Sequence, residues 1–267
     1  MIEPVLPRNE IVSVAFIALF VSCTAACTRT SSGARGMENL RVRVLAEYPH
    51  DRGAFTQGLE WHDGRLYEST GLVGRSTVRR VELETGTVEQ RAELPVEIFA
   101  EGLTRVSRRL IQLSWYNGRA IVWDLSSLQA VGEFRYTGQG WGLCHDGRRL
   151  IMSDGSDKLT FRDASTFEKI GEVSVTKQGD VLARLNELEC VDGEVYANIW
   201  PTESIARIDP ASGRVTGWID ASGLLAASER PGTDVLNGIA HLHRDRFLLT
   251  GKNWPKLFEV VFEKVQP

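Results

Sequence analysis

The chain of 267 residues lacks most of the signals of helical and redox proteins. Little of it has a sustained helical period. Its 4 cysteines form no Cys-x-x-Cys pair, and it contains no Gly-x-Ser-x-Gly nucleophile elbow. The one long apolar run, at 11–21, is shorter than the roughly 20 residues that a membrane-spanning helix needs.

The chain also lacks a strong charge of either sign. Its 31 Lys and Arg residues against 35 Asp and Glu residues give a net charge of −4, with the two signs scattered along the sequence. This balance gives no electrostatic basis for binding nucleic acid. Hydrophobic residues make up 42% of the chain, which is enough to form a core.

One short pattern is present five times. It reads Gln-Gly-Leu at 57–59, Glu-Gly-Leu at 101–103, Trp-Gly-Leu at 141–143, Asn-Glu-Leu at 186–188 and Asn-Gly-Ile at 237–239, at intervals of 44, 40, 45 and 51 residues. Each copy is followed by a polar turn, a second apolar segment and a third alternating segment. A period of 40–50 residues built from short strands indicates the blades of a β-propeller. The sequence therefore predicts an all-β fold, a five-bladed β-propeller over residues 40–267.

The two ends of this domain are predicted to close the ring. The fifth unit stops at 267 without a fourth strand, whereas the segment 40–48 precedes the first unit and belongs to no blade. We expect 40–48 to form the outer strand of the blade at 237–262. Such closure leaves only short strand edges exposed.

Residues 1–27 are predicted to be a signal peptide, followed by a flexible tether at 28–39. The leader ends in Thr-Ala-Ala-Cys, which resembles a bacterial lipoprotein cleavage box with Cys27 as the acylated residue. We therefore expect export to the periplasm or the exterior, with a lipid on Cys27 as the only membrane attachment. Soluble secretion is the alternative.

Two other sets of residues have a structural interpretation. Cys144 and Cys190 occupy equivalent places in neighbouring units, and a disulfide is compatible with export. Equivalent positions on adjacent inner strands need not come within bonding range, however, so we expect two buried free thiols. His241 and His243 alternate on one face beside a turn, and we expect a surface pair and no metal site.

The propeller geometry predicts which residues converge. The first strand of each blade lines the central channel, and the first two strands form a hairpin, so the start of one and the end of the other meet at the same mouth. Two adjacent rings are therefore expected there: Gln57, Glu101, Trp141, Asn186 and Asn237, and beside them Thr70, Trp115, Asp154, Trp200 and Lys252. Three tryptophans at one mouth favour a ligand-binding cage, and an acid entering it is a candidate proton carrier with a raised pKa.

Several phrases at these positions resemble the plant-type glutaminyl-peptide cyclotransferases of plants and bacteria. They include Phe-Thr-Gln-Gly-Leu at 55–59, Phe-Ala-Glu-Gly-Leu at 99–103, Gly-Trp-Gly-Leu at 140–143, Asn-Glu-Leu-Glu at 186–189, Ala-Asn-Ile-Trp at 197–200 and Thr-Gly-Lys-Asn-Trp at 250–254. The resemblance covers about 41–262 and implies a five-bladed propeller. It also implies cyclisation of N-terminal glutamine to pyroglutamate with release of ammonia, without a metal or other cofactor.

The resemblance also implies the roles of individual residues. The catalytic acid falls on Glu101. The substrate pocket falls on Phe55, Gln57, Phe99, Trp115, Trp141, Asn186, Trp200 and Lys252. The expected partners are peptides or proteins that begin with glutamine, and we expect a monomer.

The sequence leaves three candidates for one residue role and two alternative functions. Gln57, Asn186 and Lys252 are all candidate donors to the oxyanion of the reaction. A non-catalytic peptide-binding propeller would need the same cage without the acid. A metal-dependent lactonase-like propeller would use carboxylate and carboxamide ligands, for which Glu101, Asn186 and Asn237 are the available set.

Overall fold

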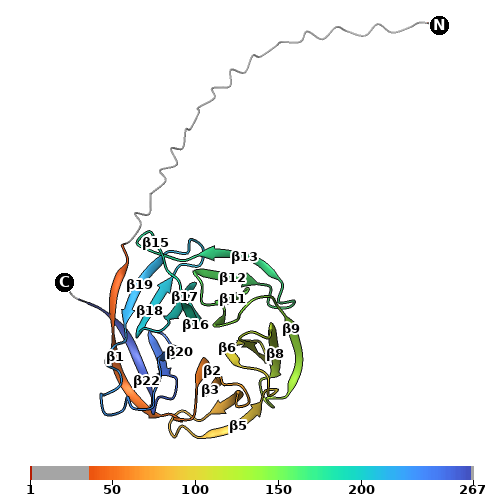
Figure 1. Ribbon diagram of the computed structural model, residues 1–267. Coiled ribbons are helices and arrows are strands. Elements are labelled where there is room, and N and C mark those ends of the chain that lie inside the picture. The colour runs from red at the N-terminus through yellow and green to blue at the C-terminus, as the bar shows by residue number, and fades with distance from the viewer. Residues whose placement is uncertain (2–35, 266–267) are drawn as a thin grey trace. The chain divides into compact units, whose positions relative to one another are not determined.

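The computed structural model describes Met1 and residues 36–265. The predicted signal peptide and Cys27 lie outside the described residues. Every regular element within 36–265 is a β-strand, and the strands are arranged around a common centre (Figure 1). The described part of the chain is therefore all-β, as predicted. A search of the same residues for a helix that could cross a membrane finds none.

Three sheets each contain four consecutive antiparallel strands. The first contains β2 (Thr56–His62), β3 (Arg65–Thr70), β4 (Thr77–Val81) and β5 (Val88–Glu93). The second contains β6 (Ala100–Val106), β7 (Arg109–Ser114), β8 (Arg119–Asp124) and β9 (Ala130–Arg135). The third contains β10 (Leu143–His145), β11 (Leu150–Met152), β12 (Lys158–Arg162) and β13 (Lys169–Ser174).

The remaining long strands form one eight-stranded sheet in the order β16-β17-β18-β19-β1-β22-β21-β20. Its first half contains β16 (Leu185–Val191), β17 (Glu194–Ile199), β18 (Ser204–Ile208) and β19 (Val215–Asp220). Its second half contains β1 (Glu38–Pro49), β22 (Lys256–Lys264), β21 (Arg246–Gly251) and β20 (Leu236–His243). A small hairpin of β14 (Thr176–Lys177) and β15 (Asp180–Val181) lies between β13 and β16 in the chain.

Strand β1 joins the two ends of the fold. It pairs antiparallel with β22, from Leu40 opposite Lys264 to Pro49 opposite Lys256, as predicted (Figure 1). The strand begins two residues earlier than expected, and its first four residues also pair parallel with residues 217–220 of β19. Because β1 hydrogen-bonds to both neighbours, it links the two halves of the eight-stranded sheet.

The innermost strands explain the repeated glycine of the motif. Strand β2 contacts β6 and β20, β6 contacts β10, β10 contacts β16, and β16 contacts β20, so these strands close a ring. Their backbones approach so closely that a Cβ on Gly102 would lie 2.6 Å from the Leu143 nitrogen, and one on Gly142 would lie 2.1 Å from the Asn186 oxygen. No side chain fits at these two positions. The fourth unit has Glu187 instead, whose carboxylate accepts hydrogen bonds from the backbone N–H groups of Leu59 and Ile239 at 3.3 and 2.9 Å.

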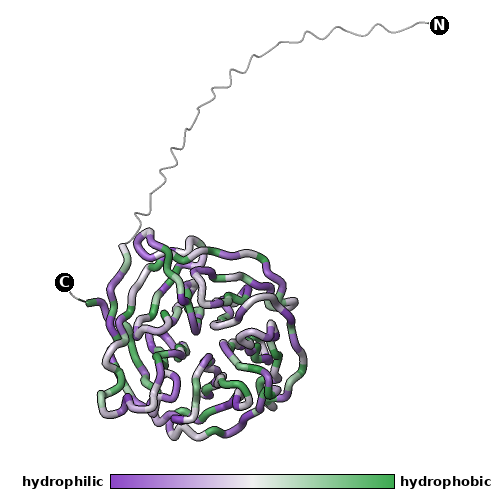
Figure 2. The backbone as a smooth tube through the Cα atoms, viewed as in Figure 1, coloured by the Kyte–Doolittle hydropathy of each residue, from purple (hydrophilic) through white to green (hydrophobic). Residues whose placement is uncertain are grey.

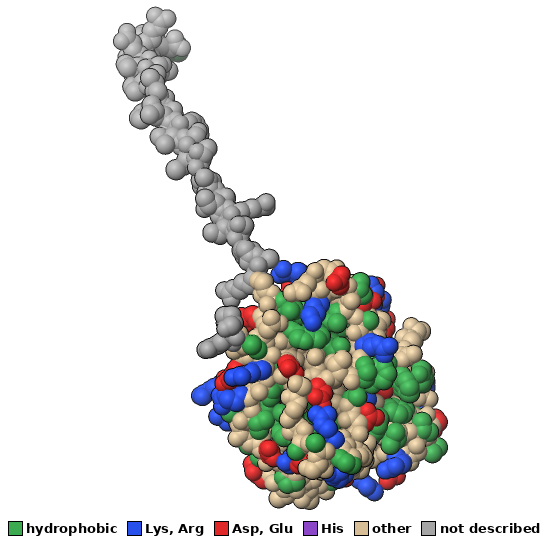
Figure 3. Space-filling view, turned by 60° about the vertical axis from the view of Figure 1, so that its left-hand side comes forward, with side chains coloured by type: hydrophobic (Ala, Val, Ile, Leu, Met, Phe, Trp, Pro, Cys, Tyr) green, Lys and Arg blue, Asp and Glu red, His purple; other side chains and the backbone are tan. Residues whose placement is uncertain are grey.

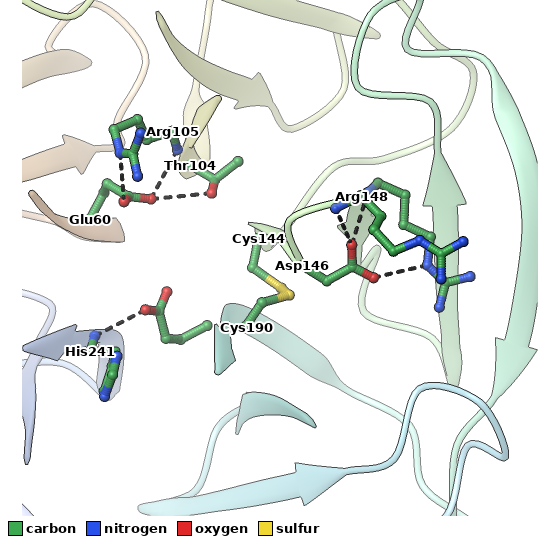
Figure 4. The surroundings of a disulfide bond; sticks show 10 residues. Glu60, Thr104, Arg105, Cys144, Asp146, Arg148, Cys190 and His241 are labelled. Carbon is green, nitrogen blue, oxygen red and sulfur yellow. Dashed lines mark hydrogen bonds and ion pairs between the residues drawn. A yellow bond between two sulfur atoms is a disulfide. The ribbon is translucent and has the colours of Figure 1, made fainter. Parts of the chain in front are cut away.

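The close approach of the inner strands also shows that the prediction of free thiols was wrong. Cys144 of β10 and Cys190 of β16 form a disulfide, with their Cα atoms 5.4 Å apart (Figure 4). Sequence spacing alone does not give the distance between equivalent positions on adjacent inner strands. Around a narrow channel the inner strands are instead close enough for a covalent link between neighbouring sheets.

Apolar side chains between neighbouring sheets form the core. The described residues contain five buried clusters, each between adjacent four-stranded groups. Leu59 of β2, for example, packs in one cluster with Leu248 of β21. Inner strands are mostly buried, whereas outer strands such as β9 are largely exposed. Polar and apolar residues accordingly alternate along much of the backbone trace (Figure 2).

A buried charged network lies where β1 leads into β2. Both ring nitrogens of His50 face acceptors: Nδ1 lies 2.8 Å from the Trp254 carbonyl oxygen and Nε2 lies 2.9 Å from the Glu68 carboxylate. Thr56 donates its hydroxyl to the same carboxylate, and Arg79 lies 3.2 Å from its other oxygen. A carbonyl oxygen and an ionised carboxylate can only accept, so His50 is a buried imidazolium. The network holds the first and last sheets together beside the chain closure.

The surface carries both charges in mixture. Acidic and basic side chains are interspersed on the face shown in Figure 3. Outer strands carry cross-strand ion pairs such as Arg80 with Glu89 at 2.9 Å. Exposed pairs of this kind contribute little to stability, typically about 0–1 kcal/mol each.

Candidate active site

A cavity of about 610 Å³ contains all nine residues that the sequence singled out for the site. Those nine are Glu101, Phe55, Gln57, Phe99, Trp115, Trp141, Asn186, Trp200 and Lys252. They come from all parts of the chain between 55 and 252, and the ring of inner strands brings them together. The structure thus brings together the nine residues that the resemblance implied, and seven of them also belong to the two rings deduced from the repeats.

The positions of these residues at strand ends, together with backbone hydrogen bonds, fix the Cα atoms from which their side chains extend. Gln57, Glu101 and Asn186 are the second residues of β2, β6 and β16. Trp115 and Trp200 directly follow β7 and β17. The Trp115 N–H donates to the Phe99 carbonyl at 2.9 Å, and the Trp200 N–H donates to the Arg184 carbonyl at 3.0 Å. Each wall of the cavity is therefore tied to the hairpin beside it.

Three members of the two predicted rings do not line the cavity. Asn237 is fully buried and lies behind Gln57. Thr70 bonds to Thr77 and lines a separate cavity of about 810 Å³. Asp154 accepts hydrogen bonds from Ser156 in its own turn. The prediction was wrong for these residues because equivalent places in the repeat do not give side chains equivalent partners: Asn237 and Thr70 bond to neighbouring strands, and Asp154 bonds within its own turn.

Glu101 is the buried acid of the cavity, with 4% of its surface exposed. The described residues offer no hydrogen bond to its carboxylate. Burial raises the pKa of Glu101 well above its usual range, and the positive charge of Lys252 opposes this shift. Burial likewise lowers the pKa of Lys252, against the charges of Glu101 and Asp234. A carboxyl group in this setting can hold a proton near neutral pH and release it when a cation arrives.

The orientation of the Gln57 carboxamide follows from its neighbours. The Asn237 side-chain nitrogen donates to the Thr56 backbone carbonyl at 2.9 Å and to Gln57 Oε1 at 3.0 Å. A carbonyl can only accept, so the Asn237 atom beside it is the NH₂ group and the Gln57 atom next to that group is oxygen. The Gln57 NH₂ group, with no acceptor among the described residues, is left as a donor in the cavity lining.

Aromatic rings form two edge-to-face arrays in the cavity wall. Phe99 lies 6.1 Å from Phe55 and 5.3 Å from Trp115, measured between ring centroids. Trp141 lies 6.0 Å from Trp200 with the rings at 89°. The Lys252 ammonium sits 4.9 Å from the Phe55 centroid. These walls can enclose a compact uncharged group and exclude water from it.

The cavity also contains residues that the sequence did not single out: Tyr116, Gln139, Arg184, Pro201, Asp234 and Val235. They lie in connections outside the repeated strands, and comparing the repeats with one another does not identify such positions. Only Tyr116 and Pro201, as direct neighbours of Trp115 and Trp200, could have been flagged from the sequence.

The other polar sets of the chain lie outside this cavity. His243 is exposed, and His241 Nε2 lies 2.9 Å from the Arg244 carbonyl oxygen. Among the described residues there is no group of three or more His, Cys, Asp or Glu side chains that could hold a metal ion.

Comparison with known proteins decides the family. The family model for glutamine cyclotransferases matches residues 15–262. The chain belongs to the glutamine cyclotransferase family. It is 43% identical over 226 residues to the glutaminyl-peptide cyclotransferase of Arabidopsis thaliana, an alignment covering 82% of this chain and 70% of that protein. This cyclotransferase-family chain also resembles the crystal structure of Myxococcus xanthus glutaminyl cyclase, with a TM-score of 0.78 and 40% identity over 86% of this chain and 100% of that chain.

Proposed function

We propose that the protein is a glutaminyl-peptide cyclotransferase of the aminoacyltransferase class, which converts N-terminal glutamine of peptides or proteins to pyroglutamate and releases ammonia. Membership of the family supports this reaction. The observation that carries it is the single buried carboxyl group, Glu101, in an aromatic cavity with side-chain donors around it.

Glu101 would act as both base and acid. A peptide α-amine has a pKa of about 7.7–8.0 and is mostly charged at neutral pH. The Glu101 carboxylate takes a proton from this ammonium, and the freed amine nitrogen attacks the carbon of the side-chain amide. A tetrahedral intermediate forms, and Glu101 passes its proton to the amide nitrogen, which leaves as ammonia when its bond to the carbon breaks. The ring nitrogen still carries two hydrogens and loses one of them to the Glu101 carboxylate, which then gives this proton up to ammonia or water. Such proton transfer typically contributes about 10²–10⁴-fold.

The remaining cavity residues would hold the substrate and its developing charge. The reaction is intramolecular, so the aromatic walls chiefly need to keep the glutamine side chain folded back toward its own amine. Negative charge grows on the side-chain oxygen in the intermediate. Gln57 presents an NH₂ group in a fixed orientation, which favours it as a donor to this oxygen. Asn186 and Lys252 are the further candidates.

We further propose that no metal or cofactor takes part, because these side chains can supply both proton transfer and oxyanion stabilisation. The metal-dependent lactonase-like alternative and the non-catalytic alternative make different predictions. Ammonia release from a dipeptide that begins with glutamine, measured with and without a chelator, separates all three. We expect release in both conditions. Peptide binding without release would support the non-catalytic alternative, and loss of release with the chelator would support the metal-dependent one.

We also propose an arrangement of blades, a compartment and an oligomeric state for the protein. We interpret the four-stranded groups as the blades of a five-bladed propeller, closed by β1 on β22. The disulfide supports export, because such bonds persist in oxidising compartments. We propose a monomer with a signal peptide at 1–27, a tether that ends at 37, before β1, and a lipid on Cys27 as the only membrane contact.

A further inference from the structure

Gln139 joins two walls of the cavity through one atom. The indole N–H of Trp115 donates to Gln139 Oε1 at 2.8 Å, and the indole N–H of Trp141 donates to the same oxygen at 2.9 Å. An indole nitrogen can only donate, so the Gln139 atom facing both rings must be the carbonyl oxygen. Trp115 follows β7 of the second sheet, whereas Trp141 precedes β10 of the third. A single acceptor thus connects the walls contributed by two neighbouring sheets.

The backbone around Gln139 is itself held firmly. The N–H of Gly140 donates to the Trp115 carbonyl at 3.1 Å, and the Tyr136 hydroxyl donates to the Ser114 carbonyl. A Cβ on Gly140 would lie 2.4 Å from the Tyr136 hydroxyl oxygen, so only glycine permits this approach. The connection between β9 and β10 therefore places the Gln139 side chain between the two indoles.

Orienting these two indoles affects the other two aromatic walls. Trp115 packs edge-to-face on Phe99 at 5.3 Å, and Trp141 packs edge-to-face on Trp200 at 6.0 Å. Without this acceptor, each half-buried indole would lose the one hydrogen bond that the described residues give its N–H group. The Gln139 oxygen fixes both edges together, which prepares the shape that holds the folded-back glutamine.

We propose that Gln139 is a positioning residue, which keeps Trp115 and Trp141 in the orientation needed for ring closure. This inference rests on the proposed function for its kinetic consequences. Gln139 need not touch the reacting atoms, because its effect passes through the two indole N–H groups.

Two substitutions separate the acceptor from the rest of the side chain. Gln139→Met has a similar length but removes the oxygen, and Gln139→Glu keeps an acceptor while removing the NH₂ group. Losing two neutral hydrogen bonds should lower kcat/KM of Gln139→Met by about ten-fold to thirty-fold, mainly through kcat. Gln139→Glu should stay within about three-fold of the wild type. The tryptophan emission spectrum should change in Gln139→Met and not in Gln139→Glu. The melting temperature of Gln139→Met should fall by no more than the loss of two hydrogen bonds accounts for, and that of Gln139→Glu should stay at the wild-type value.

A double-mutant cycle tests whether the effect passes through the indoles. Gln139→Met is added to a Trp115→Phe/Trp141→Phe background, in which neither ring can donate. We expect the substitution to lower kcat/KM no further there. A full ten-fold loss in that background would overturn the proposal, as would a wild-type Gln139→Met enzyme or a Gln139→Glu enzyme as impaired as Gln139→Met. If the wild type released no ammonia, the proposed function would fail, while the emission spectra would still test the positioning.

Discussion

Replacing Glu101 with glutamine tests the proposed mechanism most directly. The carboxylate has no hydrogen bond among the described residues, so an amide of the same size removes no hydrogen bond of the free enzyme, although it removes the charge that acts on Lys252. The loss should therefore fall chiefly on proton transfer. A loss of about 10²–10⁴-fold in kcat corresponds to a barrier raised by about 3–5 kcal/mol.

The measurements are the kcat and KM for ammonia release from a dipeptide that begins with glutamine, together with thermal unfolding. Glu93→Gln is the matched control, because the Glu93 side chain is 74% exposed and lies outside the cavity. Glu60 would be a poor control, since its carboxylate accepts hydrogen bonds from Thr104 and Arg105 (Figure 4). Near wild-type ammonia release from Glu101→Gln would refute the assignment of the proton carrier.

The raised pKa of Glu101 adds a stability test with a defined sign. Burial favours the protonated form in the folded state, so ionisation of Glu101 destabilises the protein progressively as the pH rises above the unfolded-state pKa. Glu101→Gln removes this effect. At pH 8 the variant should melt at the same temperature as the wild type or higher, and a clearly lower value would indicate a structural role for the carboxyl group.

Three further perturbations test the fold. Replacing both Cys144 and Cys190 with serine removes a cross-link between residues separated by 46 positions in the sequence. The chain entropy of such a loop predicts that the free energy of unfolding, measured by urea titration, falls by up to about 4 kcal/mol. An unchanged free energy of unfolding would mean that the bond is absent in solution. Burial disfavours the His50 cation, but the Glu68 carboxylate outweighs this and raises the pKa of His50, so its contribution should be lost as the pH rises from about 6.5 through the folded pKa. Burial also opposes the charge on Glu68, but the neighbouring cations Arg79 and His50 lower the pKa of Glu68 to about 2. Its contribution to stability should therefore be lost as the pH falls from about 4.5 to 2. His50→Gln should remove the fall in melting temperature on the alkaline side, and an unchanged pH profile of the melting temperature would contradict the network. Deleting residues 1–36 should leave an active domain, whereas deleting 1–49 removes β1, exposes the edge of β22 and should give an aggregating product in size-exclusion chromatography; a stable 50–267 protein would show that closure is dispensable.

The repeats predicted the all-β fold and the partner of the closing strand, and together with the family resemblance they predicted nine of the residues that line the cavity. The repeats were informative because the motif recurs every 40–51 residues, so side chains at equivalent places of successive units lie at the same end of the ring. Once Glu101 and Trp141 hold equivalent places in successive units, a closed ring of inner strands must bring them to the same mouth. The repeated glycine was visible too, although its cause, the contact between Gly102 and the next inner strand, needed coordinates.

The tertiary structure alone decided what depends on the distance and rotation between sheets. The Cys144–Cys190 bond was missed because sequence spacing does not give the separation of two inner strands, which here places their Cα atoms 5.4 Å apart. Asn237 was placed at the mouth, yet it is fully buried and donates to the Gln57 side-chain oxygen, which orients that amide. Gln139 lies in the connection between β9 and β10, outside the repeated strands, and its role exists only because two indoles from different sheets point at one oxygen. A linear repeat specifies which side chains share an end of the ring, whereas their directions and contacts follow from packing between sheets.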